Sequence, residues 1–371
     1  MGKDINRESY DEATLTKLEI FERYLEMWLP VFIQTPFAKS IAIWDFFAGS
    51  GQDSEGVPGS PLRIIRQIIS FKDQILKNNK SISVVLNENA TGKFTELAEL
   101  VENRRNEWNH AGLVKVECRN EDFRTLFRDR HDDLKHQPNL IFIDQYGIKH
   151  VSGEVFKTLI GLPKTDFLFF ISSSYMKRFA GTPEFKAIFP KSVLDSVANA
   201  RNADVHRTIL DYYRSLIPDG NLTILCPFTL RKGANANIYG LVFGSSSYLG
   251  VEKFLDLAWK QNELNGEANF DIDDDLGKAD KGLFEEYHRP TKVECFERDL
   301  ERFIFDAKET TNRAIYKFTL ERGHPKAHAH KCVTCLRKEN KVDYQGRIGF
   351  SYKSCFSRSA RVVTVRAAKH G

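Results

Sequence analysis

The chain has 371 residues and a formal net charge of +4, and 42% of its residues are hydrophobic and 12% aromatic. This length suits about two domains, and so much apolar material excludes a wholly disordered chain. No apolar run approaches the ~18 residues of a membrane span, and the polar first ten residues predict no secretory signal. The six cysteines are too few and too scattered for a disulfide scaffold, so we expect a cytoplasmic protein without a membrane contact.

The small net charge hides an uneven distribution. Residues 289–371 hold 19 Lys/Arg against 9 Asp/Glu, a charge of +10, so the preceding 288 residues carry −6. From Thr311 onward the counts are 14 and 3. Such asymmetry is a general indication of a contact with nucleic acid or a membrane, and an ordinary solvated basic surface is the alternative. Because no membrane partner is expected here, nucleic acid is the contact that we consider further.

The first two thirds of the chain alternate between helical and strand-like patterns. Apolar residues at three- and four-residue steps predict a helix over Thr14–Ile33, in which Pro30 marks the end or a kink. Helices are also predicted at Thr91–Glu107 and Leu249–Gln261. The predicted strands are Ser40–Phe47, Ser81–Leu86, Val114–Cys118, Leu140–Ile143, Phe167–Ile171, Leu222–Leu225 and Tyr239–Gly244. This alternation predicts an α/β, Rossmann-like domain with a mostly parallel sheet, closed on one edge by an antiparallel hairpin of the last two strands.

The last third differs in composition. Asn265–Glu286 is rich in acidic residues and predicts an acidic loop or linker; a calcium loop is the alternative, but its ligand spacing is wrong. Helices at 294–308, 311–321 and 327–340 then precede a hairpin pattern at 341–352, with Gly346 at its turn. This is the order of a winged helix-turn-helix, in which the third helix enters a DNA groove and the wing touches the backbone. We therefore expect an α/β domain over 1–265, an acidic linker over 266–288 and a basic winged-helix domain over 289–371.

Basic side chains on the third helix and the wing are suited to phosphate contacts, although a plain solvated face is the alternative. The candidate nucleic-acid-binding residues are His328, His330, Lys331, Arg337, Lys338, Arg347 and Lys353. Cys332 and Cys335, with Cys355 and several histidines nearby, could instead bind zinc. Because the first two lie three residues apart in a helix with apolar neighbours, we expect them to face the core and predict no metal.

The strongest motif is Asp45-Phe46-Phe47-Ala48-Gly49-Ser50-Gly51, directly after the first predicted strand. Small residues let a backbone pass close to a ligand, and Gly59-Ser60-Pro61 then begins a helix. The motif lacks the spacing of the dinucleotide fingerprint and the Lys of a phosphate loop. An ordinary tight turn is the alternative.

Carboxylates after later strands strengthen the functional interpretation. Ligands of doubly wound sheets lie beyond the carboxyl ends of the strands, where Glu88, Asp122 and Asp144 are expected. Glu88 could accept both ribose hydroxyls of an adenosyl cofactor, and Asp122 could reach the adenine amino group. Asp144 could accept a hydrogen bond from a nucleophilic amine, and Tyr146 could stack on a flat substrate. Together with Asp45, Phe47, Ala48, Gly49 and Gly51 around the cofactor, these residues predict an S-adenosylmethionine-dependent methyltransferase.

The chain also resembles the three-Cys-motif partner proteins of bacteria. The resemblance rests on KLEIFERYL in the first helix, DFFAGSG followed by EGVPGSPL, DQYG after the fourth strand, and TNRAIYKFTLERG near the C-terminus. It implies a class I methyltransferase-like domain with a seven-stranded sheet, followed by a winged helix, and a radical-SAM-like partner protein that bears three cysteines. It also implies that Asp45, Gly49 and Gly51 line the cofactor, that Glu88 holds its ribose, and that Asp144, Gln145, Tyr146 and Gly147 form the catalytic loop.

That loop resembles the Asp-Pro-Pro-Tyr loop of amino-group methyltransferases that act on nucleic acid, but Gln145 stands where a proline is expected. Two functions follow. The first is methylation of nucleic acid, of a base amino group as the leading choice, with the winged helix binding DNA more readily than RNA. The alternative is a catalytically inactive nucleic-acid-binding partner protein in a bacterial defence or mobile-element system, because proline would fix the loop and Gln145 does not.

Overall fold

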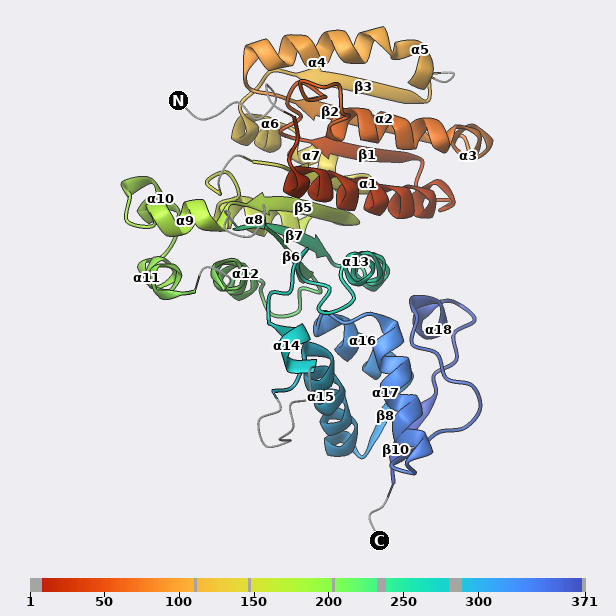
Figure 1. Cartoon of the computed structure of the whole chain (residues 1–371). Coiled ribbons are helices and arrows are strands. Elements are labelled where there is room, and N and C mark those ends of the chain that lie inside the picture. The colour runs from red at the N-terminus through yellow and green to blue at the C-terminus, as the bar shows by residue number, and fades with distance from the viewer. Residues whose placement is uncertain are drawn as a thin grey trace. The chain divides into compact units, whose positions relative to one another are not determined.

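The computed structural model describes residues 9–109, 112–145, 148–201, 204–231, 238–279 and 289–368. The chain divides into two compact units, Met1–Ser246 and Ser247–Gly371 (Figure 1). Each unit has a hydrophobic core of its own.

The first unit is built on a seven-stranded sheet with the order β3-β2-β1-β4-β5-β7-β6. Its strands are β1 (Ser40–Asp45), β2 (Ser81–Asn87), β3 (Val114–Arg119), β4 (Asn139–Ile143), β5 (Thr165–Ile171), β6 (Ile224–Arg231) and β7 (Ile238–Ser245). The first five strands are parallel, and β7 runs antiparallel to both β5 and β6. This order, with a reversed strand inserted before the last, is that of the class I methyltransferase fold, so the predicted fold class and edge hairpin are confirmed.

Helices cover both faces of this sheet. They are α1 (Glu12–Ile33), α2 (Ser60–Ser70), α3 (Lys72–Lys77), α4 (Thr91–Asn103), α5 (Arg105–Trp108), α6 (Phe123–Asp129), α7 (His131–Lys135) and α8 (Gly153–Gly161), followed by α9 (Ser173–Phe179), α10 (Pro183–Ile188), α11 (Lys191–Asn199) and α12 (Val205–Ser215) between β5 and β6. Successive residues of a strand point to opposite faces. Phe142 of β4 therefore stacks on Phe21 of α1 with ring centroids 4.3 Å apart, while Ile141 and Ile143 pack into the core that includes Phe123 of α6 and Phe156 of α8.

Helix α1 begins where the side chain of Asp11 accepts a hydrogen bond from the backbone N–H of Thr14. It continues through Pro30 and ends at Ile33. One stripe of the helix is buried, and Phe21, Tyr24 and Trp28 are nearly inaccessible. The stripe anchors the start of the described chain across the sheet.

The second unit contains α13 (Tyr248–Gln261), α14 (Asp275–Ala279), α15 (Lys292–Ala307), β8 (Glu309–Thr311), α16 (Asn312–Glu321), α17 (Lys326–Lys338), β9 (Val342–Asp343), α18 (Tyr352–Phe356) and β10 (Thr364–Ala367). Strand β10 lies between β8 and β9 and is antiparallel to both. The order from α15 to β10 is helix, strand, two helices, then two strands that enclose a long loop. The predicted winged helix is therefore confirmed.

The wing differs from the prediction. A hairpin over 341–352 with its turn at Gly346 is wrong, because Asp343 of β9 pairs with Arg366 of β10. Residues 344–363 form a loop that contains α18. Tyr344 and Phe350 are buried in the unit's core, at 8% and 3% exposure. The alternating apolar pattern of this segment thus reflects packing beneath a loop rather than strand pairing.

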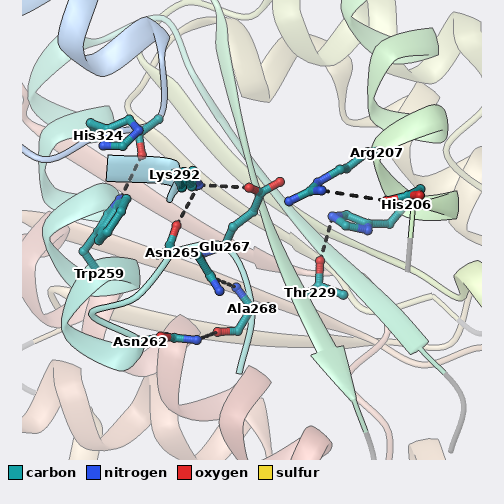
Figure 2. A network of polar contacts seen from close by, with 12 residues as sticks. His206, Arg207, Thr229, Trp259, Asn262, Asn265, Glu267, Ala268, Lys292 and His324 are labelled. Carbon is teal, nitrogen blue, oxygen red and sulfur yellow. Dashed lines mark hydrogen bonds and ion pairs between the residues drawn. The ribbon is translucent and has the colours of Figure 1, made fainter. Parts of the chain in front are cut away.

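Part of the acidic stretch is folded into the second unit. Asn265 and Ala268 are fully buried. The ammonium of Lys292 donates to the carbonyl of Asn265 at 2.6 Å and to the carboxylate of Glu267 at 2.9 Å (Figure 2). The carboxylate of Asp271 accepts from two backbone N–H groups at the start of α14. These acidic groups cap a helix and pair with a cation, and residues 280–288 of the stretch lie outside the described part of the chain.

Candidate cofactor site and nucleic-acid interface

The loop after β1 depends on its glycines. Gly49 and Gly51 have φ angles of 61° and 88°, in the left-handed region that suits glycine. A Cβ on Gly51 would lie 2.7 Å from a methyl group of Leu100 in α4. One on Gly59 would lie 2.9 Å from the hydroxyl of Tyr10 and 3.0 Å from the carbonyl oxygen of Gly51. Packing therefore holds the backbone at Gly51 and Gly59 close to its neighbours, and a side chain at either position would have to displace them.

Asp45 ends β1 and is fully buried. Its Oδ1 accepts from the backbone N–H of Phe47 at 3.2 Å, and the side chain of Ser60 lies near enough to the carboxyl to lower its pKa. Burial, reinforced by Asp144 and Glu88, raises the pKa of Asp45 to about 7. Its Oδ2 has no hydrogen-bond partner within the described residues. A buried carboxylate oxygen without a donor suits a ligand that brings one, such as a charged amine.

Glu88 joins the loop after β2 to the glycine loop. Its Oε2 accepts from the backbone N–H of Gly49 at 3.0 Å, and its Oε1 accepts from that of Ala90 at 2.7 Å. The backbone N–H of Ala48 donates to the carbonyl of Asn87 at 2.8 Å. The half-buried carboxylate keeps further lone pairs for other donors. The structure thus brings Asp45, Gly49 and Glu88 together at the carboxyl edge of neighbouring strands.

Asp122 caps the N-terminus of α6. Its Oδ1 accepts from the backbone N–H groups of Arg124 and Thr125, so it caps α6. Beside the cap, the rings of Phe47, Phe123 and His150 lie within 6 Å of one another, centroid to centroid. Burial, with smaller effects of nearby cations, lowers the pKa of His150. A neutral aromatic group of this kind can pack against a flat ring.

Sequence patterns did not identify Lys17. Its ammonium donates to Oδ2 of Asp144 at 2.5 Å and lies 4.6 Å from the ring centroid of Phe170 in β5. The side chains of Lys17 and Asp144 are 9% and 21% exposed. The only available signal was a lysine placed one turn before Phe21 on the apolar stripe of the first helix. Such a lysine is rarely buried without a partner.

Gln145 is buried and holds the loop between β4 and α8. Its amide nitrogen donates to the carbonyl of Phe170 at 3.0 Å. Its amide oxygen accepts from the backbone N–H groups of His150 and Val151, at 2.8 and 3.4 Å. The glutamine therefore fixes the loop by hydrogen bonds, where a proline would fix it by its ring. The other two predicted residues of this loop, Tyr146 and Gly147, lie outside the described residues.

The predicted basic residues of the winged helix are mostly at its surface. His330, Lys331, Arg337, Lys338, Arg347 and Lys353 are exposed. Lys331 pairs with Glu297 at 3.4 Å, and the guanidinium of Arg337 lies 4.0 Å from the ring centroid of Tyr344.

His328 is placed differently from the other predicted basic residues. It is half-buried, its Nδ1 lies 2.9 Å from that of His324, and its ring contacts Trp259 edge-on. Burial, with nearby Lys331 and Lys292, lowers its pKa to about 4, so the ring is neutral at pH 7. The structure therefore turns His328 toward the interior.

The cysteines of α17 face different surroundings. Cys332 is buried against the carbonyl of Glu297, as expected, whereas Cys335 is exposed beside Glu339, so the expectation that both face the core is wrong for Cys335. Residues three apart in a helix differ by about 300° around its axis, so one of them can be buried while the other lies outside a narrow buried stripe. Across residues 9–368, apart from the gaps given above, no three His, Cys, Asp or Glu side chains gather as a metal site. Among the described helices, none has the length and apolar composition needed to cross a membrane.

A family model described as a GMT-like wHTH domain matches residues 269–349. Among solved structures, the O-methyltransferase TomG from Streptomyces achromogenes, determined with SAM and involved in tomaymycin synthesis, is 12% identical. The similarity covers 63% of this chain and 90% of that one, with a TM-score of 0.32. An arsenic(III) S-adenosylmethionine methyltransferase from Chlamydomonas reinhardtii is 10% identical over 56% of this chain and 64% of that one, with a TM-score of 0.30. No curated protein matches.

Proposed function

We propose that this chain is an S-adenosylmethionine-dependent methyltransferase that acts on nucleic acid, with the amino group of a base as the leading substrate. The observation that carries the proposal is the buried, unpartnered oxygen of Asp45 beside two left-handed glycines and the Glu88 carboxylate. These groups stand on a class I methyltransferase sheet, at the carboxyl edge where such folds bind ligands.

The residues around the glycine loop fit the cofactor. When bound, S-adenosylmethionine supplies an electrophilic methyl group on a cationic sulfonium. Glu88 would accept from the ribose hydroxyls, and Asp45 from the cofactor's ammonium. Asp45, Glu88 and Asp144 outweigh the single cation Lys17 among these residues, so the charge of the site favours the cationic cofactor over its neutral product.

Asp144 is the proposed acceptor for the substrate amine. Its Oδ2 is held by Lys17, and within the described residues no partner occupies its Oδ1. A hydrogen bond from the amine to Oδ1 would orient the nitrogen lone pair, which is the main contribution that a protein makes to such a transfer. Gln145 holds the backbone behind it, so the absent proline does not leave this loop unsupported.

The winged helix is the proposed nucleic-acid-binding part. The +10 charge of residues 289–371, the exposed cations of α17 and the loop after β9, and the GMT-like wHTH match support this role. We favour DNA over RNA because the third helix of a winged helix suits the major groove of B-form DNA.

We also propose membership of the three-Cys-motif partner family, a cytoplasmic location and a radical-SAM-like partner with three cysteines. The support is the resemblance of the α1, glycine-loop and α16 segments.

Calorimetry with S-adenosylmethionine tests the cofactor. We expect binding heat with the wild-type chain and at least tenfold weaker binding by Asp45→Asn, which keeps the size of the side chain and removes its charge. Asp132→Asn, at an 86% exposed side chain of α7, is the matched control and should bind like wild type. No heat with the wild-type chain, or unchanged affinity of Asp45→Asn, contradicts the proposal.

Methyl transfer from tritiated cofactor to unmethylated plasmid DNA and to total RNA tests the substrate. We expect label in DNA, recovered as an N-methylated base after hydrolysis, and loss of label with Asp144→Asn. Label in RNA alone moves the substrate to RNA. Cofactor binding without any transfer removes nucleic acid from the proposal.

A further inference from the structure

The second unit carries a stack of aromatic rings that the proposed function does not use. The ring of Phe356 in α18 stacks on that of Tyr248 at 5.5 Å and on that of Tyr352 at 5.7 Å, with interplanar angles of 12° and 24°. All three rings are half-buried, so part of each reaches the surface. We call these three rings, with the two cations described next, the aromatic platform.

Two cations from α16 lie against these rings. The guanidinium carbon of Arg313 is 4.9 Å from the ring centroid of Phe356, and Nζ of Lys317 is 5.3 Å from that of Tyr248. Within the described residues neither cation forms an ion pair within 4 Å, although the carboxylate of Glu321, one turn after Lys317 in α16, lies near enough to interact electrostatically with Lys317 and Tyr248. Arg313 is instead held by its Nε, which donates to the carbonyl of Cys355 at 2.9 Å and leaves both terminal nitrogens free of a described contact.

Neighbouring lysines of the same unit are neutralised. Lys326 pairs with Glu252, Lys331 with Glu297 and Lys341 with Glu301, at 3.0–3.4 Å. Arg313 and Lys317 share the lack of a described ion-pair partner with exposed cations such as Arg337 and Lys338, but they differ in lying against the three rings. Their charge is complementary to an anionic ligand that also reaches the rings.

A buried carboxylate fixes the shape of the platform. Oε2 of Glu252 accepts from the hydroxyl of Tyr316 at 2.8 Å and from the backbone N–H of Tyr352 at 2.7 Å. Tyr316 is fully buried, and its ring centroid lies 6.0 Å from that of Phe356. These bonds tie α13, α16 and α18 together. A ligand would meet rings that are already ordered, which lowers the entropic cost of binding.

We propose that the aromatic platform binds single-stranded nucleic acid, stacking an unpaired base while Arg313 and Lys317 contact its phosphates. Flat aromatic side chains interleaved with cations are the usual means of binding such strands, and a duplex hides the base faces that stacking requires. The platform consists of residues other than the candidate contacts of α17. The inference rests on the proposed nucleic-acid binding and deepens it, because an enzyme that modifies a base works on a nucleotide outside the duplex.

Fluorescence anisotropy of the full chain with labelled oligothymidine and with a labelled duplex tests this site. We expect Phe356→Leu and Lys317→Gln each to weaken strand binding by about tenfold and duplex binding by less than about twofold. Arg337→Gln on α17 is the matched control and should weaken duplex binding more than strand binding. If both platform variants bind the strand like wild type, or lose strand and duplex equally, the platform is not a strand site.

Two further measurements separate this inference from other failures. Thermal unfolding identifies a misfolded Phe356→Leu variant, in which case the surface variant Lys317→Gln decides. Polyglutamate, an anionic polymer without bases, should compete poorly for the platform. If it displaces the strand and Phe356→Leu binds the strand as tightly as wild type, the platform is only a basic surface and the proposal is overturned. If calorimetry finds no cofactor binding but the platform variants lose the strand selectively, the proposed reaction fails and the platform stands.

Discussion

The pair of Lys17 and Asp144 shows how a single residue can change the interpretation of a motif. The sequence after β4 suggested a loop whose aspartate would be open to a substrate amine. In the structure one of its two oxygens is already occupied, by a lysine from a helix 127 residues earlier in the chain. The pair lies partly out of water and is supported by the Phe170 ring, so its geometry is more fixed than that of a surface ion pair.

We expect Lys17→Met and Asp144→Asn to be strongly coupled in stability. Removing either partner leaves the other without its counter-charge, whereas removing both does not. Urea unfolding of the four proteins should give a coupling of about 1–3 kcal/mol. Glu19 and Arg23 form an exposed pair on the same helix and provide the control cycle, with a coupling below about 0.5 kcal/mol. Additive effects at Lys17 and Asp144 would show that the pair is incidental.

The raised pKa of Asp45 predicts a pH dependence of stability. Its folded value of about 7 exceeds the unfolded value of 3.8, so the folded chain binds the extra proton between these limits. The free energy of unfolding should therefore fall as pH rises from about 4 to 7 and level off above, by at most about 4 kcal/mol from this group. Denaturant unfolding of Asp45→Asn should show a flatter profile, and the difference between the two curves isolates the group. A difference that does not change with pH contradicts the assignment.

At the scale of elements, buried strands were the most predictable feature. Six of the seven begin and end within two residues of the predicted bounds, since strands buried on both faces need apolar runs, whereas β6 (Ile224–Arg231) shares only two residues with the predicted Leu222–Leu225. Strand β6 is longer than expected because it includes Pro227, which an edge strand tolerates. The wing was missed because Tyr344 and Phe350 face the core from a loop.

The candidate site was predictable where it is local in sequence. The glycine loop and Glu88 follow from residue types placed just after strands. The roles of Lys17 and Gln145 depend on how α1 and β5 dock, and no local pattern contains that information.

Replacing Glu252, whose carboxylate contacts residues of α16, α17 and α18, should destabilise the second unit. Glu252→Gln removes the charge that accepts from two donors and pairs with Lys326, leaving that lysine to Asp256 alone. We expect a loss of about 1–3 kcal/mol in urea unfolding. Asp299→Asn, which breaks the more exposed pair with Arg322, is the control and should cost less than about 1 kcal/mol. Equal losses would mean that Glu252 is not a structural centre of the unit.

At the scale of the whole molecule, the charge of +4 is the sum of two unlike parts. The +10 of residues 289–371 predicts binding to duplex DNA that weakens steeply as salt rises, because bound phosphates release counterions. Changing both Arg337 and Lys338 to Gln should reduce the slope of log affinity against log salt by about 2. Anisotropy titrations between 50 and 200 mM salt measure the slope, and an unchanged slope would place the phosphate contacts elsewhere.

The reversed strand β7 also has a consequence for how the first unit is made. Strand β5, with the sequence TDFLFFI, pairs on one side with β7, which is synthesised only after α9 to α12 and β6. Asp166 of β5 receives hydrogen bonds from Tyr24 of α1 and Ser245 of β7, so the earliest and the latest elements meet at one carboxylate. Until Ser245 has left the ribosome, the phenylalanine-rich strand β5 remains an unpaired sheet edge, and exposed apolar edges of this kind are prone to aggregate. Biosynthesis of this protein therefore has a vulnerable interval that ends only when its seventh strand is inserted.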